Sequence, residues 1–119
     1  MRPRPARGSM RRIYELQCQI CKAMAHSLRL EIVDLLGEDE ISAASLLSRL
    51  GTSKANLSKH MTQLVLAGIV EQRRDGRQVF YRLTHREIHE ACTIMRNILM
   101  RRIRKEEQLA AALAAPVRR

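Results

Sequence analysis

The chain has 119 residues and a formal net charge of +10. This length accommodates one domain with a modest core, and such an excess of cations favours nucleic acid or an anionic membrane surface as partner. Only one Phe, two Tyr and no Trp are present, which argues against a protein that stacks single-stranded bases. No run approaches the roughly 20 apolar residues of a membrane span. Three cysteines indicate thiols in a reducing cytoplasm rather than structural disulfides.

The N-terminal part of the domain is predicted to be a helix over Arg11–Ala25. We expect residues 1–10 to form a basic disordered arm, residues 11–106 the folded domain, and residues 107–119 a frayed tail. One apolar stripe on the helix consists of Ile13, Leu16, Ile20 and Met24, and a second beside it of Tyr14, Cys18, Cys21 and Ala25. Two stripes form a wider apolar face than a lone surface helix needs.

A second helix is predicted to begin at a Ser27 cap and to end at Gly37. Its inner face carries four apolar residues, which are Leu28, Ile32, Leu35 and Leu36. The run Glu38-Asp39-Glu40, called here the acidic loop, follows it. Because these acids cluster in one loop, we expect that loop to be solvated.

Two shorter helices come next, separated by a glycine. Ser42 is predicted to cap the first, which ends at Gly51, and Thr52 or Ser53 caps the second, which runs to Gly68. Two helices joined by a tight glycine-containing turn are typical of a helix-turn-helix.

Residues 69–83 change to the alternating pattern of strands. Val79, Tyr81 and Leu83 alternate with more polar positions, and Asp75-Gly76 is a strong hairpin signal. Thr84 is expected to cap a long last helix with one continuous apolar stripe. That stripe consists of Ile88, Cys92, Met95, Leu99 and Ile103.

The helix predicted over Ser53–Ala67 has two unlike faces. Its inner side carries Leu57, Met61, Leu64 and Val65, and its outer side carries Ala55, Asn56, Ser58, Lys59, Thr62 and Gln63. A helix used only for packing usually mixes Glu with Lys on its wet face. Cations, amides and hydroxyls without an acid instead suit phosphates and base edges in a major groove. A merely solvated face is the alternative, against which the hairpin cations Arg73, Arg74, Arg77 and Arg82 argue.

At these residues the sequence resembles the ArsR/SmtB family of winged-helix repressors. The resemblance rests on KAMAHSLRLEIVDLL and on SKANLSKHMTQLVLAGIVEQRRDGRQVFYRL. It implies a mostly α fold with a β-hairpin wing, in the order of four helices, two strands and one helix. It also implies a homodimeric repressor on inverted-repeat DNA, which in most members is released by a metal, a metalloid or an oxidant. The residues expected to contact double-stranded DNA are Ser53, Lys54, Asn56, Ser58, Lys59, His60, Thr62, Gln63, Arg73, Arg74 and Arg77.

The first and last helices are the expected dimer surface. A monomer of this size can hardly cover both apolar faces, whereas a two-fold dimer buries them and sets two reading helices about 34 Å apart. The alternative is that the stripes pack only within one chain. The interface residues we expect are Ile13, Leu16, Ile20, Ile88, Met95 and Leu99.

The cysteines are the candidate effector site. Cys18 and Cys21 lie three residues apart on one helix face, and the family fold would bring Cys92 of the last helix towards them. Three thiolates suit As(III) or a similar soft ion, and a thiol pair suits oxidation or persulfide formation. Lys22 and Arg96 are neighbouring cations that would lower the thiol pKa. Simple core packing is the alternative, since Cys also behaves as a small hydrophobe.

Two other sensor sites known in the family are not expected here. The segment ISAASLLSRL contains no cysteine for a thiolate site on the third helix, and the zinc-type site on the last helix lacks its later ligands. His85 and His89, spaced i, i+4, remain a weaker metal candidate.

The function predicted is therefore sequence-specific transcriptional regulation in the cytoplasm, with no cofactor required. A thiol-bound metalloid or metal, or an oxidant, is the expected effector class. An effector-independent DNA-binding or co-regulator protein, with cysteines used only for packing, is the alternative. No nucleophile triad, paired carboxylates or phosphate-binding loop indicates an enzyme. A membrane-surface binder is the third class considered.

Overall fold

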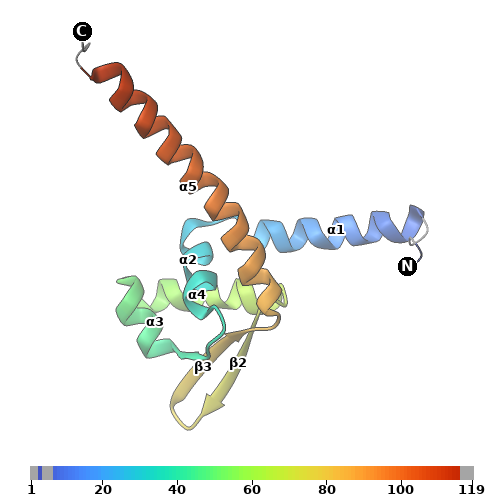
Figure 1. The fold of residues 1–119 in the computed structure, drawn as a ribbon. Helices are drawn as coiled ribbons and strands as arrows, with labels where there is room; N and C mark the ends of the chain where they lie inside the picture. Colours follow the sequence, from blue (N-terminus) through green and yellow to red (C-terminus); the bar gives the residue numbers. More distant parts are fainter. Residues whose placement is uncertain (1–2, 4–6, 116–119) are drawn as a thin grey trace.

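The computed structural model describes residue 3 and residues 7–115 of the chain. Helices dominate it, and a short three-stranded sheet lies at one end (Figure 1). The elements in chain order are α1 (Arg7–Met24), α2 (Ser27–Leu36), β1 (Ile41–Ser42), α3 (Ala43–Leu50), α4 (Lys54–Leu66), β2 (Val70–Asp75), β3 (Gln78–Leu83) and α5 (Arg86–Ala114). The predicted class, mostly helical with a β-hairpin wing, is confirmed.

The core lies where α2, α3 and α4 meet the base of the sheet. Apolar residues at helical spacing on α2 and α4 pack together in this core, and residues of the short strands complete it. Its buried members are Ile32, Val33, Leu36, Ile41, Leu46, Leu57, Met61, Leu64, Ile69, Val70 and Tyr81. This core buries the inner face of α4 and leaves the opposite face exposed.

The sheet is antiparallel, with the strand order β1-β3-β2. Asp75 pairs with Gln78 across the turn, and Gly76 has a φ of 61°, so the predicted hairpin is confirmed. β1 was not predicted. It contains only Ile41 and Ser42, which pair with Tyr81 and Phe80 of β3 and join the start of α3 to the hairpin.

The helix caps are as predicted at Ser42 and Ser53 and differ from the prediction at Ser27 and Thr84. The hydroxyls of Ser42 and Ser53 accept hydrogen bonds from backbone N–H groups at the starts of α3 and α4, as expected. His26, and not Ser27, caps α2 through Nδ1, which accepts from the Leu28 N–H at 3.1 Å. Thr84 does not cap α5: its hydroxyl contacts the backbone oxygens of residues 68 and 69 instead.

The first and last helices extend further than expected. α1 begins at Arg7, so residues 7–10 are helical, and α5 continues to Ala114, beyond the boundary placed after residue 106. Residues 1, 2 and 4–6 of the predicted arm and residues 116–119 of the predicted tail lie outside the described residues. Both helices project from the core (Figure 1). The radius of gyration is 19.5 Å, whereas a compact chain of this length has about 13.5 Å.

Candidate nucleic-acid interface

The turn between α3 and α4 fixes the orientation of α4. Gly51 ends α3 in the left-handed region, with a φ of 63°, and its N–H donates to the Leu47 carbonyl. A residue with a side chain is rarely stable there. Two residues later, the Ser53 hydroxyl accepts from the Asn56 N–H at 3.1 Å and starts α4. The pair α3–α4 is therefore a helix-turn-helix, with α4 as its second helix.

The outer face of α4 is exposed as predicted. Its sequence KANLSKHMTQLVL contains no acid. The exposed predicted contacts on or next to this helix are Ser53, Lys54, Ser58, Lys59, Thr62 and Gln63. Asn56 is half-buried, and its amide nitrogen donates to the Thr52 hydroxyl at 2.8 Å. The Thr62 hydroxyl donates to the Ser58 carbonyl at 2.8 Å. This face offers hydroxyls, an amide and cations to a polyanion.

His60, which was expected to contact DNA, does not lie on this outer face. Its side chain is 4% exposed and lies on the inner side of α4. Its Nδ1 accepts a hydrogen bond from Arg29 Nε at 3.0 Å. Burial lowers the pKa of His60, and positive charge on His26 when it is protonated, on Arg29 and on Lys59 lowers it further. A buried, internally bonded ring cannot touch DNA directly.

The wing, the β2–β3 hairpin of residues 70–83, presents its cations unequally. Arg74 and Arg77 are exposed, and neither takes part in an ion pair within the described part of the chain. Arg73 is also partly exposed, but its guanidinium makes two hydrogen bonds to Glu40, at 2.6 and 3.2 Å, and lies 4.5 Å from the Phe80 ring centroid. Arg74 and Arg77 are therefore the wing cations most available to a phosphate.

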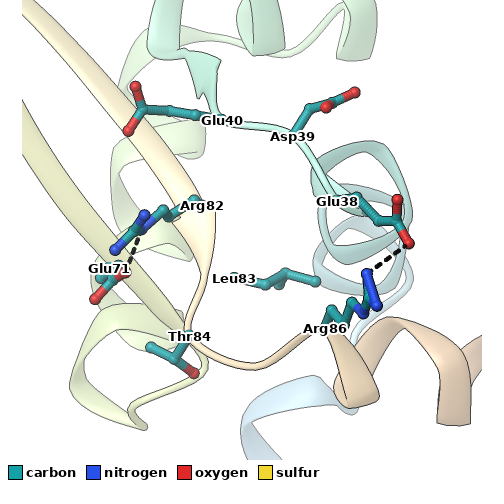
Figure 2. A pocket seen from close by; sticks show the side chains of 9 residues that line it. Glu38, Asp39, Glu40, Glu71, Arg82, Leu83, Thr84 and Arg86 are labelled. Carbon is teal, nitrogen blue, oxygen red and sulfur yellow. Dashed lines mark hydrogen bonds and ion pairs between the residues drawn. The ribbon is translucent and has the colours of Figure 1, made fainter.

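The acidic loop is exposed, as predicted, and the carboxylates of Glu38 and Glu40 also form ion pairs. It lines a pocket of about 510 Å³ beside the base of the wing (Figure 2). In this pocket Arg86 pairs with Glu38 at 3.4 Å, and Arg82 pairs with Glu71 across the two strands of the wing. Since both arginines of the pocket already have carboxylate partners, we interpret it as the electrostatic base of the wing rather than as a ligand site.

The predicted dimer surface is largely exposed in the single chain. Over residues 7–24 α1 has no buried residue, and over residues 86–114 α5 has none. Five of the six predicted interface residues are exposed, and these are Ile13, Leu16, Ile20, Met95 and Leu99. Ile88 differs, because it is half-buried and packs against the core of its own chain.

The three cysteines do not form one cluster within the chain. Cys18 and Cys21 are exposed on α1, whereas Cys92 is half-buried and packs against the core. Burial raises the pKa of Cys92, and this outweighs the lowering by Arg96, so the expected activation of this thiol is wrong. Among the described residues no three His, Cys, Asp or Glu side chains are placed to hold a metal ion.

The weaker histidine candidate is also used differently. His89 Nε2 lies 3.3 Å from Asp34 Oδ1, and Arg96 donates to the same oxygen at 2.7 Å. His85 Nδ1 lies 3.2 Å from the Thr84 hydroxyl. Asp34 thus connects α2 to α5, and His89 is part of that contact.

None of the described helices is both long enough and apolar enough to cross a membrane.

A helix-turn-helix with a basic hairpin beside its second helix defines a winged helix-turn-helix protein. Residues 24–73 match the family described as a helix-turn-helix domain. The chain is 36% identical over 90 residues to the HTH-type transcriptional regulator Rv0081 of Mycobacterium tuberculosis strain H37Rv, across 75% of this chain and 79% of that protein. The crystal structure of Rv0081 has a TM-score of 0.68 at 34% identity and covers 79% of this chain and 95% of its own.

Two further relatives have more specific names. The transcriptional activator HlyU of Vibrio cholerae is 39% identical over 69 residues, across 58% of this chain and 64% of that protein. Reduced HlyU has a TM-score of 0.68 at 31% identity, covering 76% of this chain and 95% of its own. The arsenical resistance operon repressor of Staphylococcus aureus is 40% identical over 72 residues, across 60% of this chain and 69% of that protein.

The chain belongs to the ArsR/SmtB-type family of helix-turn-helix transcriptional regulators. It is a DNA-binding regulator and not an enzyme.

Proposed function

We propose that the chain is a homodimeric regulator that binds an inverted-repeat operator sequence-specifically. The α4 helix of each protomer lies in a major groove, and Arg74 and Arg77 of each wing contact neighbouring phosphates. The observation that carries this proposal is the exposed face of α4, which has no acid and lies beside the basic wing. Its amide and hydroxyl groups read base edges, and its lysines contact phosphates.

The exposed apolar faces of α1 and α5 support the homodimer. Apolar side chains along both are about half exposed, with Leu16 at 42% and Leu99 at 48%. Exposed apolar area of this extent usually marks a protein interface. A two-fold axis through these helices sets two α4 helices about one DNA turn apart, which matches an inverted repeat.

Selection of bound duplexes from a random pool tests this proposal. We expect the selected DNA to contain an inverted repeat and to be bound much more tightly than random duplex. In the same assay Lys59→Gln lowers the affinity and reduces the log-affinity versus log-salt slope by about 0.9 per protomer.

Lys105→Gln is the matched control, because it removes the same charge from the projecting part of α5. It should leave both quantities unchanged. Equal affinity of the wild-type protein and Lys59→Gln at moderate salt would overturn the assignment of α4.

The effector we propose is a thiol-reactive one, a soft metalloid such as arsenite or a mild oxidant. Cys18 and Cys21 are exposed and lie one helical turn apart, which is close enough for two bonds to one As(III). Each As–S bond forms as the thiol proton and one arsenic-bound hydroxyl leave together as water. A relative named for arsenical resistance supports this class. The three free thiols suit a reducing cytoplasm.

An effector-independent regulator is the second candidate. The packing of Cys92 against the core favours it, because this thiol already has a structural role. Operator affinity measured with and without arsenite, and with and without a mild oxidant, separates the two. A thiol sensor loses affinity about 5- to 150-fold, and Cys18→Ser/Cys21→Ser does not respond. If the double variant responds as the wild type does, this pair is not the sensor.

Repression is the sign that we propose, since a bound dimer blocks access to the operator. The relatives' names include an activator and a repressor. A reporter gene placed behind the selected operator decides the sign: expression that rises when the regulator is deleted supports repression, and expression that falls contradicts it.

A further inference from the structure

Arg29 joins three helices around the inner side of α4. It belongs to α2, its Nη1 donates to the Ala23 carbonyl near the end of α1 at 3.0 Å, and its Nε donates to His60 Nδ1 at 3.0 Å. His60 is the one buried polar side chain within the described core. The guanidinium therefore connects the outermost helix of the predicted dimer surface to the DNA-reading helix.

A second histidine completes the cluster. The rings of His26 and His60 are 4.3 Å apart between centroids and tilted by 48°. His26 Nδ1 accepts from the Leu28 N–H and so caps α2. In both rings Nδ1 is an acceptor, so the hydrogen-bond pattern assigns a neutral ring with its proton on Nε2.

Protonation of His60 is incompatible with this arrangement. A proton on Nδ1 would face the Arg29 N–H, so that a hydrogen bond becomes a contact between two donors that are both cationic. The charged groups that act on the ring are Arg29 from α2, Lys59 from α4 and, when protonated, His26 from the junction of α1 and α2. With the ring only 4% exposed, water cannot compensate for the added charge.

We propose that His60 is a positioning residue of α4, held by Arg29, and that its protonation in mildly acidic solution displaces α4 and weakens DNA binding. This inference rests on the proposed DNA-binding function. It makes the contact between His60 and Arg29 an acid-sensitive link from α1 to the DNA-reading helix.

The direction of the effect distinguishes this link from ordinary electrostatics. The pKa of His60 lies below its ordinary value of about 6.5, so the ring is neutral at neutral pH and acquires its proton only in acid. Acidification in general makes a protein more positively charged, and added positive charge strengthens DNA binding. A loss of affinity on acidification therefore opposes the general trend.

The test is the affinity of the full chain for its selected duplex, from about pH 8 to about pH 5 at fixed ionic strength, a range that spans histidine titration. We expect wild-type affinity to fall at least about fivefold, the lower end of typical coupling between sites. His60→Gln keeps an acceptor for Arg29 but cannot be protonated, so its affinity stays level or rises in acid. His85→Gln, which changes an exposed histidine, follows the wild type.

A second measurement tests the same inference without DNA. Hydrogen exchange of the α4 amides reports whether acid loosens the helix, with exchange rates corrected for their intrinsic pH dependence. The wild-type amides should lose protection and those of His60→Gln should keep it. If His60→Gln does not fold, Arg29→Gln replaces it and should show a smaller acid-dependent loss of protection, because the protonated ring no longer faces a cationic donor.

The outcomes separate the two proposals. Absence of specific duplex binding at every pH refutes the proposed function, while the exchange data still judge the His60 link. Tight binding with the same pH profile in wild type and His60→Gln leaves the function intact and refutes the link.

Discussion

Arg73 of the wing and Glu40 of the acidic loop form a two-point contact, with Nη2 2.6 Å from Oε1 and Nε 3.2 Å from Oε2. The guanidinium also lies over the ring of Phe80, its cross-strand neighbour. Parallel hydrogen bonds of this kind hold a planar cation in one orientation. Arg73 therefore fastens the wing to the core, although its residue type alone suggests a phosphate contact.

Arg73 and Arg77 of the wing should differ in their effect on DNA binding. Arg77 lies in the turn between Asp75 and Gln78, and no ion pair among the described residues involves it. Arg77→Gln should reduce the salt slope by about 0.9 per wing. Arg73→Gln should leave the slope nearly unchanged, because this cation is already neutralised by Glu40. Fluorescence anisotropy at several salt concentrations measures both, and equal slope changes would contradict the distinction.

The same contact should be visible in the titration of Glu40. The hydrogen bond from Arg73 lowers the pKa of Glu40, and the charges of Arg73 and Arg82 add to the lowering. Because the folded-state pKa lies below the unfolded one, the contact stabilises the fold above about pH 4.3, the ordinary glutamate value, and its contribution is lost as the pH falls through the folded-state pKa. Carboxyl-carbon NMR should give a higher pKa for Glu40 in Arg73→Gln. Arg77→Gln, an equal charge change on the same wing, should not alter it.

Dimerisation should depend on the exposed stripe of α5. Met95 is 66% and Leu99 48% exposed in the single chain. Met95→Lys/Leu99→Lys should therefore leave the fold intact and produce a monomer, which sedimentation and circular dichroism can show together. Leu66→Lys is the control, since Leu66 is 76% exposed at the end of α4 and lies outside α1 and α5. A double variant that remains dimeric would place the interface elsewhere.

The three thiols should react at different rates. Cys92 is half-buried and burial raises its pKa, so little thiolate is present at neutral pH. Cys18 and Cys21 are exposed. Alkylation followed by mass spectrometry of the peptides should label the α1 pair first and Cys92 last. Denaturation should remove the difference, and a Cys92 that reacts first in the folded protein would contradict its assignment to the core.

The Ser53 cap should contribute measurably to stability. Its hydroxyl satisfies the Asn56 N–H at the start of α4, and loss of such a cap costs about 1 kcal/mol. Urea unfolding should show this loss for Ser53→Ala. For Ser58→Ala, at an exposed position inside the same helix, the change should stay within about 0.5 kcal/mol.

Local chemistry explains which parts of the fold were predictable. Asp75-Gly76 predicts a tight turn, and the serines at positions 42 and 53 predict helix starts. Both predictions are confirmed, because each signal acts within a few residues. β1 has two residues, too few for any alternation, and it exists only because β3 lies alongside it. The predicted Thr84 cap failed for a similar reason, since carbonyls 15 and 16 residues away engage its hydroxyl.

The sequence predicted the candidate nucleic-acid interface correctly for residues whose role depends on exposure of the side chain to solvent. An acid-free helix face can be read from spacing alone, and the predicted exposure of Ser58, Lys59 and Gln63 is confirmed. His60 was misplaced although the signal was present: it lies three residues after Leu57 and four before Leu64, on the apolar side. The engagement of Arg73 was not predictable, because its partner Glu40 is 33 residues away.

Ser42 has two roles that belong to different parts of the molecule. It pairs with Phe80 of the wing, and its hydroxyl caps α3. Ser42 therefore joins the hairpin to the start of the helix-turn-helix, next to the pairing of Ile41 with Tyr81, so these two parts are held in a fixed relative position. Under the proposed function, the spacing between the bases contacted by α4 and the phosphates contacted by the hairpin is therefore fixed, and inserting a single base pair between them should be poorly tolerated.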